Sequence, residues 1–503
     1  MKTLDQPQDV AAWLRATVTG ALHCDSRRLQ PGDGFVAWPG AATDGRRFVH
    51  SALASGAVAA VVERDGVEAF ALEDERVLAV RGLKAQAGAI ASGFCDHPSA
   101  ALDVLAITGT NGKTSCAWWI AQLLSVCARP CAVIGTLGMG QPGSTLVPTG
   151  LTTPDPVMLQ QQLRQYVDEG VKACAIEASS IGLIEGRLNA TRVRVAVFTN
   201  FTQDHLDFHG SMDAYWEAKA MLFDWPGLGA AVVNTDDGRG GQLASRANGR
   251  GLDLWTVGID STARLNAVDI TFTRAGMAFG VVERDLQGVE VERHTLQVPL
   301  VGRYNVSNLL CVIAAARSVG ISLQQAVKAC GALTPVPGRM EQAEVVAIDQ
   351  PLVLVDYAHT PDALEKALQA VQPLAAQRGG ALWVVVGCGG DRDAGKRPLM
   401  AAVAERGAVH VVLTSDNPRS EDPVRILSQM VTGLSHAGAA LVEPDRAAAI
   451  ATVVACAQAS DVVLIAGKGH EDYQEVMGVK TPFSDLVQAR QALARRAAQG
   501  AHA

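Results

Sequence analysis

The sequence predicts an α/β fold, in which mostly parallel sheets carry helices on both faces. Its length of 503 residues exceeds what one hydrophobic core supports and suits roughly two to four domains. Short apolar runs alternate with longer helical patterns, and this order is typical of parallel sheets. The composition has 49 glycines and only 5% aromatic residues, which is typical of α/β domains with tight turns between strands and helices.

Three segments follow one another along the chain. The first reaches about Pro98 and combines apolar runs at residues 58–62 and 77–80 with turn-rich stretches. The second and third are separated by a candidate hinge at residues 335–338, and the third is predicted to be a further, doubly wound unit. Strand candidates in the second segment are residues 104–107, 131–134, 173–176, 193–198 and 230–233; those in the third are 352–355, 382–386, 409–413 and 462–465.

Composition excludes several classes of protein. The net charge of −8 argues against broad nucleic-acid binding. No apolar run approaches the roughly 20 residues that span a bilayer, and the first ten residues lack a secretory pattern, so we expect a cytoplasmic protein without membrane insertion. The ten cysteines stand singly apart from Cys127 and Cys131, and no second pair accompanies these two, so the sequence does not predict a zinc site.

A phosphate-binding loop is predicted at residues 108–114, which read Thr-Gly-Thr-Asn-Gly-Lys-Thr between a strand candidate and a helical pattern. Gly109 and Gly112 let the backbone approach phosphate oxygens, and the free N–H groups at the helix start favour an anion. Lys113 can neutralise β- and γ-phosphates, and the final threonine can hold Mg²⁺ through its hydroxyl. Ile107 stands where the strict P-loop pattern has its first glycine, so the loop is a shortened variant.

Two further polar clusters follow strand candidates of the second segment. Glu177 begins the run Glu-Ala-Ser-Ser, where a carboxylate beside a phosphate loop is well placed for a metal; a buried structural carboxylate is the alternative. Residues 204–209 contain two histidines and two aspartates, which indicates metal or phosphate chemistry as readily as a structural role. Hard oxygen ligands favour Mg²⁺ over zinc. On composition alone, Lys219 in the helical stretch 214–223 is an ordinary surface lysine.

Polar loops also begin where each strand candidate of the third segment ends. In open α/β sheets ligands bind at this edge, so four such loops indicate one shared site. Arg392 and Arg419 are suited to holding a carboxylate through two parallel hydrogen bonds. The loops are residues 356–359, 387–393, 416–419 and 467–471.

With these residues assembled, the chain resembles the Mur ligases, which build the peptide stem of bacterial peptidoglycan. The resemblance covers nearly the whole chain. Within the family, the chain is most similar to the diaminopimelate-adding members, because residues 416–419 read Asp-Asn-Pro-Arg, and lysine-adding relatives differ there. The other matching positions are residues 25–27, 31–32, 35–37, 44–47, 108–114, 177–180, Asn200, Asp204, His205, 302–305, Asn308, 338–341 and 356–359.

The resemblance implies three domains: residues 1–98 for the uridine nucleotide, a central P-loop-type ATPase at residues 99–338, and a C-terminal Rossmann-like domain at residues 339–503 for the amino acid. It implies that ATP phosphorylates the D-Glu side-chain carboxylate of UDP-MurNAc-L-Ala-D-Glu. The amine of meso-diaminopimelate would then attack the acyl phosphate. It further implies Mg²⁺ as cofactor, as two ions, and a cytoplasmic enzyme of cell-wall synthesis that we expect to be a monomer.

The resemblance also implies a role for individual residues. The residues expected to act in catalysis are Lys113, Lys219, His205 and Arg339. The residues expected to bind the metal ions are Thr114, Glu177, His205 and Lys219, the last as a carbamate (N6-carboxylysine). ATP is expected at Gly109, Thr110, Asn111, Gly112, Lys113, Thr114, Ser115, Asn305 (adenine), Arg339 and Asp356 (ribose). The muramoyl nucleotide is expected at Ser26, Thr152, Thr153, Ser179, Glu185 and Arg187. Diaminopimelate is expected at Arg392, Asp416, Asn417, Pro418, Arg419, Gly467 and Glu471, with Arg419 on its distal carboxylate.

Three departures from the family pattern leave substrate contacts open: Ile181 where many relatives have His, Glu185 where Gln is common, and residues 41–43 in place of a more polar stretch. The nearest alternatives are a lysine-adding relative and a folylpolyglutamate synthase. Arg419 argues against lysine, and the long N-terminal segment argues against the folate enzyme. A nucleotide-switch or transport ATPase is the alternative from another class of protein. Such a protein would not require four polar loops on a second α/β unit, so these loops argue against it.

Overall fold

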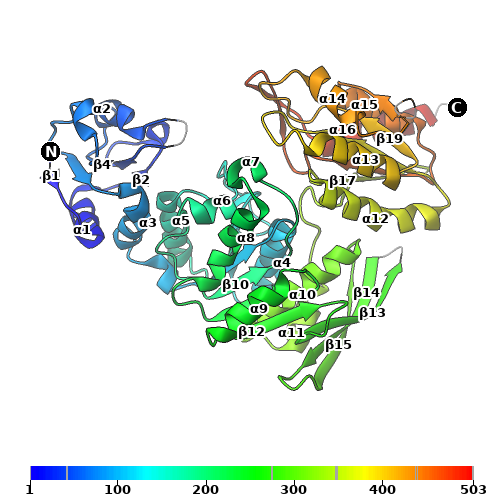
Figure 1. Ribbon diagram of the computed structural model, residues 1–503, viewed down its shortest axis with the longest axis horizontal. Helices are drawn as coiled ribbons and strands as arrows, with labels where there is room; N and C mark the ends of the chain where they lie inside the picture. The colour runs from blue at the N-terminus through cyan, green and yellow to red at the C-terminus, as the bar shows by residue number, and fades with distance from the viewer. Residues whose placement is uncertain are drawn as a thin grey trace.

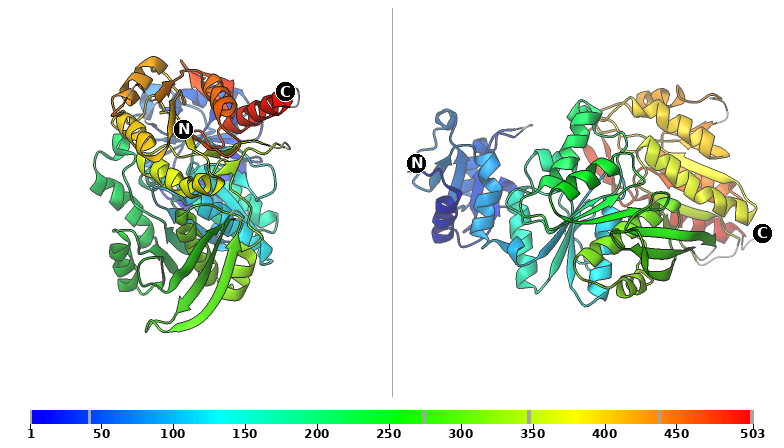
Figure 2. Two further views of the ribbon diagram at one scale, coloured as in Figure 1. Left: turned by 90° about the vertical axis from the view of Figure 1, so that its right-hand side faces the viewer. Right: turned by 60° about the horizontal axis from the view of Figure 1, so that its bottom comes forward.

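The computed structural model describes residues 2–40, 43–273, 276–345, 349–436, 438 and 440–500. Three main sheets follow one another along the chain and lie in a row, with the second between the other two (Figures 1 and 2). The predicted α/β class with mostly parallel sheets is confirmed. Ala41 and Ala42, in the stretch that departs from the family pattern, lie outside the described residues.

The first sheet is entirely parallel, in the order β1-β5-β4-β3-β2. Its strands are β1 (Lys2–Thr3), β2 (Leu22–His23), β3 (Gly34–Ala37), β4 (Ala59–Glu63) and β5 (Val77–Val80). Helices α1 (Pro7–Thr17) and α3 (Leu83–Phe94) cover one face and α2 (Val49–Ala54) the other. The 3-10 turns in this part of the chain are η1 (Ser26–Arg28), η2 (Gly45–Phe48) and η3 (Val67–Phe70), and η4 (Pro98–Ala100) follows before the second sheet begins. All residues of β3, β4 and β5 are buried, as helices on both faces require.

The second sheet has the order β15-β14-β13-β12-β11-β10-β6-β9-β7-β8, with a parallel centre. Its strands are β6 (Asp103–Thr108), β7 (Cys131–Gly135), β8 (Gly138–Gly140), β9 (Ala173–Glu177), β10 (Val195–Phe198), β11 (Ala230–Asn234), β12 (Asp253–Gly258), β13 (Leu265–Thr273), β14 (Gly276–Arg284) and β15 (Glu290–Val298). One face carries α4 (Lys113–Val126), α10 (Arg303–Ser318) and α11 (Leu323–Cys330). The other carries α5 (Pro156–Asp168), α6 (Ser180–Ile184), α8 (Met212–Ala220), η5 (Met221–Asp224) and α9 (Gly240–Gly249), and α7 (Leu206–His209) lies before α8.

The third sheet has the order β16-β17-β21-β18-β19-β20 and is parallel except for β16. Its strands are β16 (Glu341–Gln342), β17 (Leu352–Asp356), β18 (Leu382–Val386), β19 (His410–Leu413), β20 (Ala440–Val442) and β21 (Val462–Ala466). One face carries α12 (Pro361–Arg378), α13 (Lys396–Gly407) and α14 (Pro423–Val431), and the other α15 (Arg446–Cys456) and α16 (Asp485–Gly500). Strands β22 (Tyr473–Val476) and β23 (Val479–Pro482) form a separate hairpin.

Each strand candidate of the sequence is found as a strand, shifted by at most two residues at an end. The antiparallel ribbon of β13, β14 and β15 was not predicted, because strands that are open to solvent on one face give no continuous apolar run. In β15, for example, only Leu296 and Val298 are buried. The β22–β23 hairpin was missed for the same reason.

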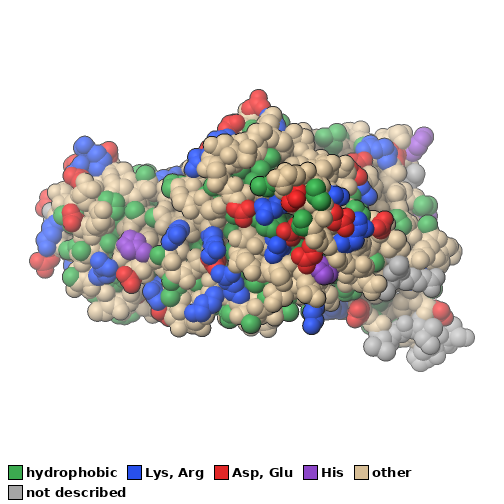
Figure 3. Space-filling view, turned by 90° about the horizontal axis from the view of Figure 1, so that it is seen from below, with side chains coloured by type: hydrophobic (Ala, Val, Ile, Leu, Met, Phe, Trp, Pro, Cys, Tyr) green, Lys and Arg blue, Asp and Glu red, His purple; other side chains and the backbone are tan. Residues whose placement is uncertain are grey.

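Acidic and basic side chains are interspersed over the face seen in Figure 3, and neither sign covers it alone. Within the described parts of the chain, no helix is both long enough and apolar enough to cross a membrane.

The candidate hinge at residues 335–338 joins the second sheet to the third and is pinned at both ends. The Trp119 indole N–H donates to the carbonyl of Thr334 at 3.0 Å, and Val336 is buried. Gly338 adopts a φ of 66° and packs against the backbone of Gly469 and His470, so there is no room for a β-carbon.

We predict that Gly338→Ala destabilises the protein more than Gly379→Ala. Both glycines have a positive φ, near 66° and 69°, which costs an alanine about 1–2 kcal/mol. Only at Gly338 would the new methyl group also collide with backbone atoms, and we expect a total loss of about 3 kcal/mol or more. Urea unfolding of both variants tests this, and equal losses would show that the contact with His470 is unimportant.

Candidate active site

The phosphate loop lies between β6 and α4, where the sequence places it. Gly109 and Gly112 have φ values of 146° and 85°, and added β-carbons would meet Thr199 and Asn308 respectively, so both positions require glycine. The ammonium group of Lys113 donates to the carbonyls of Gly109 and Thr110, at 2.8 Å in each case. Burial lowers the pKa of Lys113. The loop is therefore closed around its own lysine.

The segment after β10 braces this loop from the side. Asn200 accepts a hydrogen bond from the Asn111 N–H at 2.9 Å and donates to the Asn111 carbonyl at 3.1 Å. Thr199 donates to the same carbonyl at 2.6 Å. Thr110 in turn donates to the carbonyl of Thr202 at 3.0 Å. The parallel pairing of β6 with β10 brings the two loops to one edge and so makes these contacts possible.

Glu177 ends β9 beside the loop and is 1% exposed. Its carboxylate accepts hydrogen bonds from the Thr114 hydroxyl at 3.0 Å and from the Thr136 hydroxyl at 3.2 Å and N–H at 2.8 Å. A buried carboxylate next to a hydroxyl at a phosphate loop is a donor set of hard oxygens, which suits Mg²⁺. Within the described residues no three His, Cys, Asp or Glu side chains lie close enough to hold a metal by themselves. A Mg²⁺ here would therefore share its coordination with phosphate oxygens.

Lys219 points inward from α8 and is 1% exposed, contrary to what its composition alone suggests. Its ammonium group donates to the Gly109 carbonyl at 2.8 Å and lies 4.3 Å from the ring centre of Tyr215. Burial, and then the neighbouring Lys113, lower its pKa well below the ordinary value for lysine. His205 precedes α7, with its side chain 41% exposed and 3.4 Å from the carboxylate of Asp204.

A cavity of about 520 Å³ opens beside the phosphate loop, a size that suits a nucleotide. It lies between α10 of the second sheet's domain and α12 of the third's. Asn305 is held there by a hydrogen bond to the Val301 carbonyl, and Asp356 accepts one from the Met340 N–H at 2.8 Å. The residues expected at ATP that line it are Asn111, Gly112, Ser115, Asn305, Arg339 and Asp356.

Arg339 connects this cavity to the metal candidates. One of its terminal nitrogens lies 3.4 Å from the Thr114 hydroxyl, and its guanidinium stacks over the Tyr357 ring at 4.6 Å. Its Nε is buried and makes no hydrogen bond among the described residues. An anionic group bound between the loop and Arg339 would satisfy that nitrogen.

Four of the residues expected at the muramoyl nucleotide form one hydrogen-bonded group. Thr153 pairs with Ser179 at 2.9 Å and accepts a hydrogen bond from Arg187 at its carbonyl, at 3.1 Å. Thr152 lies 3.2 Å from the Thr136 hydroxyl, next to Glu177.

The other two residues expected at this substrate make no hydrogen bond to this group within the described residues. Glu185 forms an ion pair of 2.6 Å with Lys84 of the first domain, so it contributes to a contact between domains. Ser26 begins η1 on the first domain. Within the described residues no hydrogen bond or ion pair joins Ser26 to the group around Thr153.

The four polar loops of the third sheet meet at its carboxyl edge. Asn417 donates to the Glu471 carboxylate at 2.8 Å, and Gly467 leaves room for the carboxylate of Asp416. Arg419 donates to the carbonyl of Gly390 at 2.8 Å, while Arg392 is exposed. The Pro418 carbonyl packs against Gly390 and leaves no room for a β-carbon at that glycine.

The sequence analysis missed several residues that shape this site. Asp362 at the start of α12 accepts a hydrogen bond from Asn111 at 2.9 Å, and so joins the phosphate loop to the third sheet's domain. Tyr215 pairs with Thr110 at 3.2 Å, and Lys468 is buried between Asn417 and Glu471. Lys468 lies inside the polar loop 467–471, but of that loop only Gly467 and Glu471 were expected to bind the amino acid.

Three family models match the chain: Mur ligase family, catalytic domain, at residues 20–94; Mur ligase middle domain at residues 107–316; and Mur ligase, glutamate ligase domain, at residues 338–469. The curated protein "UDP-N-acetylmuramoyl-L-alanyl-D-glutamate–2,6-diaminopimelate ligase" of Acidovorax sp. (strain JS42) is 57% identical, and the match covers 99% of each chain. The protein of that name from Janthinobacterium sp. (strain Marseille) is 48% identical over 97% of each chain.

Solved structures give the same picture. A structure of an enzyme with that name is 38% identical, with a TM-score of 0.63 over 95% of each chain. MurF from Acinetobacter baumannii is 19% identical, with a TM-score of 0.67 over 91% of this chain and 94% of that one, and so supports the fold alone.

We predict that Lys113→Ala weakens the binding of nucleoside triphosphate by about 10- to 100-fold, because a charged hydrogen-bond donor is lost at the phosphate loop. The matched control is Lys366→Ala, which removes an ammonium group of α12 that lines the same cavity. We expect the control to change affinity by less than about threefold, since Lys366 is partly exposed and already paired with Asp362. Equilibrium binding of Mg·ATP measures both, and equal losses would place the phosphates elsewhere.

Proposed function

The chain belongs to the Mur ligase family, and from that membership we propose that it is an ATP-dependent amide ligase adding meso-2,6-diaminopimelate to the D-Glu side-chain carboxylate of UDP-MurNAc-L-Ala-D-Glu. The observation that carries the proposal is the match over the full length to relatives bearing the name of that enzyme. The geometry supports it, because a phosphate loop and a polar edge of the third sheet lie on either side of Arg339.

We propose a division of labour along the chain. Residues 1–98 hold the uridine nucleotide, residues 99–338 bind ATP, and residues 339–503 bring the amino acid. The muramoyl dipeptide would lie near Thr152, Thr153, Ser179 and Arg187, next to the ion pair between Glu185 and Lys84 at the first domain. The enzyme would act in the cytoplasm, as a monomer, on small-molecule substrates.

The reaction needs activation, since a carboxylate is a poor electrophile. Transfer of the γ-phosphoryl group of ATP to the D-Glu carboxylate gives an acyl phosphate and ADP. The neutral amine of diaminopimelate then attacks the acyl carbon, loses a proton, and expels phosphate to leave an amide. Charge accumulates on phosphoryl oxygens in both steps, so fixed cations around them lower the barrier. Lys113 and Arg339 are the cations at the loop.

The site also fits a divalent metal. We propose that Thr114 and Glu177 hold one Mg²⁺, and that His205 and a carbamylated Lys219 hold a second. When bound, these ions supply charge neutralisation for the phosphate oxygens. Burial of Lys219 favours the modification, since only a neutral amine adds to CO₂ and burial lowers the pKa of Lys219, which increases the neutral fraction.

Amino-acid specificity is proposed to depend on Arg419. Its backbone is fixed by hydrogen bonds with the β22–β23 hairpin, from the Arg419 N–H to the Glu475 carbonyl and from the Met477 N–H to the Arg419 carbonyl. The guanidinium makes one hydrogen bond, to Gly390, and has further donors for the distal carboxylate of diaminopimelate. Lysine lacks that carboxylate and would leave the arginine unpaired.

We predict that phosphate release in the presence of ATP, Mg²⁺ and UDP-MurNAc-L-Ala-D-Glu requires meso-diaminopimelate and does not occur with L-lysine. Arg419→Ala should raise the KM for diaminopimelate by about 10- to 100-fold while the KM for ATP stays constant, because one charge-assisted contact is lost. The matched control is Arg378→Ala, which removes a guanidinium at the opposite edge of the same sheet. Equal turnover with lysine would contradict the proposed specificity for diaminopimelate.

We also predict that Lys219→Arg lowers kcat by about 100-fold or more, as much as Lys219→Ala does. Arginine keeps the positive charge but cannot form a carbamate, so a role for the charge alone would leave Lys219→Arg active. Turnover measured with and without added bicarbonate, together with intact-protein mass spectrometry at neutral pH, reports the modification. High activity of Lys219→Arg would contradict the carbamate.

A further inference from the structure

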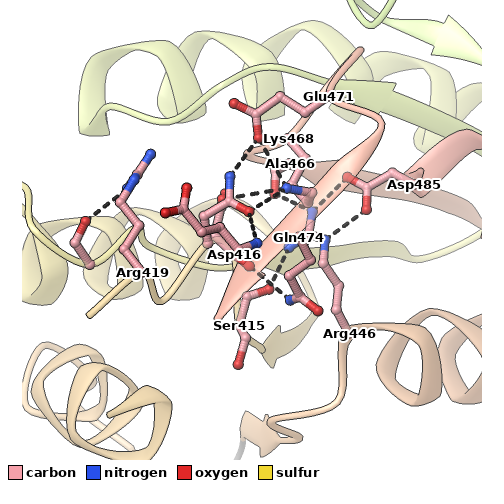
Figure 4. Close-up of polar contacts among 12 residues, drawn as sticks. Ser415, Asp416, Arg419, Arg446, Ala466, Lys468, Glu471, Gln474 and Asp485 are labelled. Carbon is pink, nitrogen blue, oxygen red and sulfur yellow. Dashed lines mark hydrogen bonds and ion pairs between the residues drawn. The ribbon is translucent and has the colours of Figure 1, made fainter. Parts of the chain in front are cut away.

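A buried lysine lies directly beneath the proposed amino-acid site. Lys468 follows β21 and is 0% exposed. Lysine is almost never fully buried unless its ammonium group is paired. Its ammonium group donates to Oδ1 of Asn417 and to Oε2 of Glu471, at 3.0 Å in each case, and lies 4.0 Å from the carboxylate of Asp416 (Figure 4). The lysine therefore contacts the side chains of three residues that are proposed to bind diaminopimelate.

These contacts fix the orientation of Asn417. Its Oδ1 accepts from Lys468 and, at 3.0 Å, from the N–H of Glu475. With the oxygen engaged twice, the amide nitrogen must point the other way, where it donates to Oε2 of Glu471 at 2.8 Å. A rotation of the amide by 180° about its last bond would bring its NH₂ group against the ammonium group of Lys468, which has no acceptor.

The same contacts give the two carboxylate oxygens of Glu471 different roles. Oε2 accepts hydrogen bonds from both Lys468 and Asn417, so both of its lone pairs are engaged within the protein. Among the described residues no hydrogen bond is made by Oε1, which is left as the acceptor for a ligand. Burial, and then Asp416, raise the pKa of Glu471, and Lys468 opposes that rise.

A separate buried pair holds the backbone of the same loops. Arg446 forms two hydrogen bonds of 2.7 Å with Asp485 and donates to the carbonyls of Ser415 and Ala466, at 3.2 and 3.0 Å (Figure 4). Because Arg446 and Asp485 already fix the main chain, Lys468 is not needed for that purpose. Its contacts are with side chains.

We infer that Lys468 is a positioning residue for amino-acid recognition: it holds Asn417 and Glu471 so that Oε1 of Glu471 faces the ammonium group of the incoming amino acid. The inference rests on the proposed function of this edge as the amino-acid site. It differs from a purely structural ion pair, since it places the effect of Lys468 on one substrate alone.

The test compares Lys468→Met with Asp461→Asn in the full-length enzyme. Asp461 is a buried charged residue at the opposite end of β21, where it accepts from the Ala381 N–H and the Trp383 indole. Lys468→Met should raise the KM for diaminopimelate by about 10- to 100-fold, with kcat at saturation and the KM values for ATP and the muramoyl nucleotide within about threefold of the parent. Asp461→Asn should leave the KM for diaminopimelate unchanged.

An unchanged KM for diaminopimelate in Lys468→Met would overturn the inference, and so would an equal rise in Asp461→Asn. If Lys468→Met does not fold, Lys468→Gln, which keeps an NH₂ donor group but loses the charge, should fold and raise the KM for diaminopimelate by about 3- to 10-fold; an unchanged value would equally overturn the inference. Failure of the parent enzyme to use diaminopimelate would instead reject the proposed function.

Discussion

Two lysine side chains converge on one backbone carbonyl, that of Gly109, and much of the site depends on this contact. Lys113 and Lys219 both donate to it at 2.8 Å, although they come from α4 and α8. Burial lowers the pKa of Lys219, and repulsion from the neighbouring ammonium group of Lys113 lowers it further. The loop conformation thus determines the positions of Lys113 and Lys219 together.

A second dependence links the phosphate loop to the third sheet's domain. Asp362 accepts hydrogen bonds from Asn111 and Lys366, and Arg339 lies between Thr114 and Tyr357. Two of these contacts, Asn111 with Asp362 and Thr114 with Arg339, pair a residue of the phosphate loop with a residue of the third sheet's domain.

The third sheet separates main-chain support from side-chain orientation. Arg446 and Asp485 hold the carbonyls where β19 and β21 end, whereas Lys468 orients Asn417 and Glu471 above them. Charged groups buried in this way are costly unless they are fully paired. At the edge proposed to bind the amino acid, such paired charges supply acceptors and donors that are fixed before a ligand binds.

The sequence by itself determined the fold class, most of the buried parallel strands and the position of the phosphate loop, because apolar runs buried on both faces and a glycine-rich turn before a helix are local signals. It also indicated that the loops ending β17, β21, β18 and β19 share an edge, since the carboxyl ends of parallel strands always do. Only the tertiary structure decided that Lys219 is buried, that Asp362 contacts Asn111 and that Lys468 lies beneath Glu471. Burial and pairing depend on which distant segments pack together, and no local pattern of residues records that.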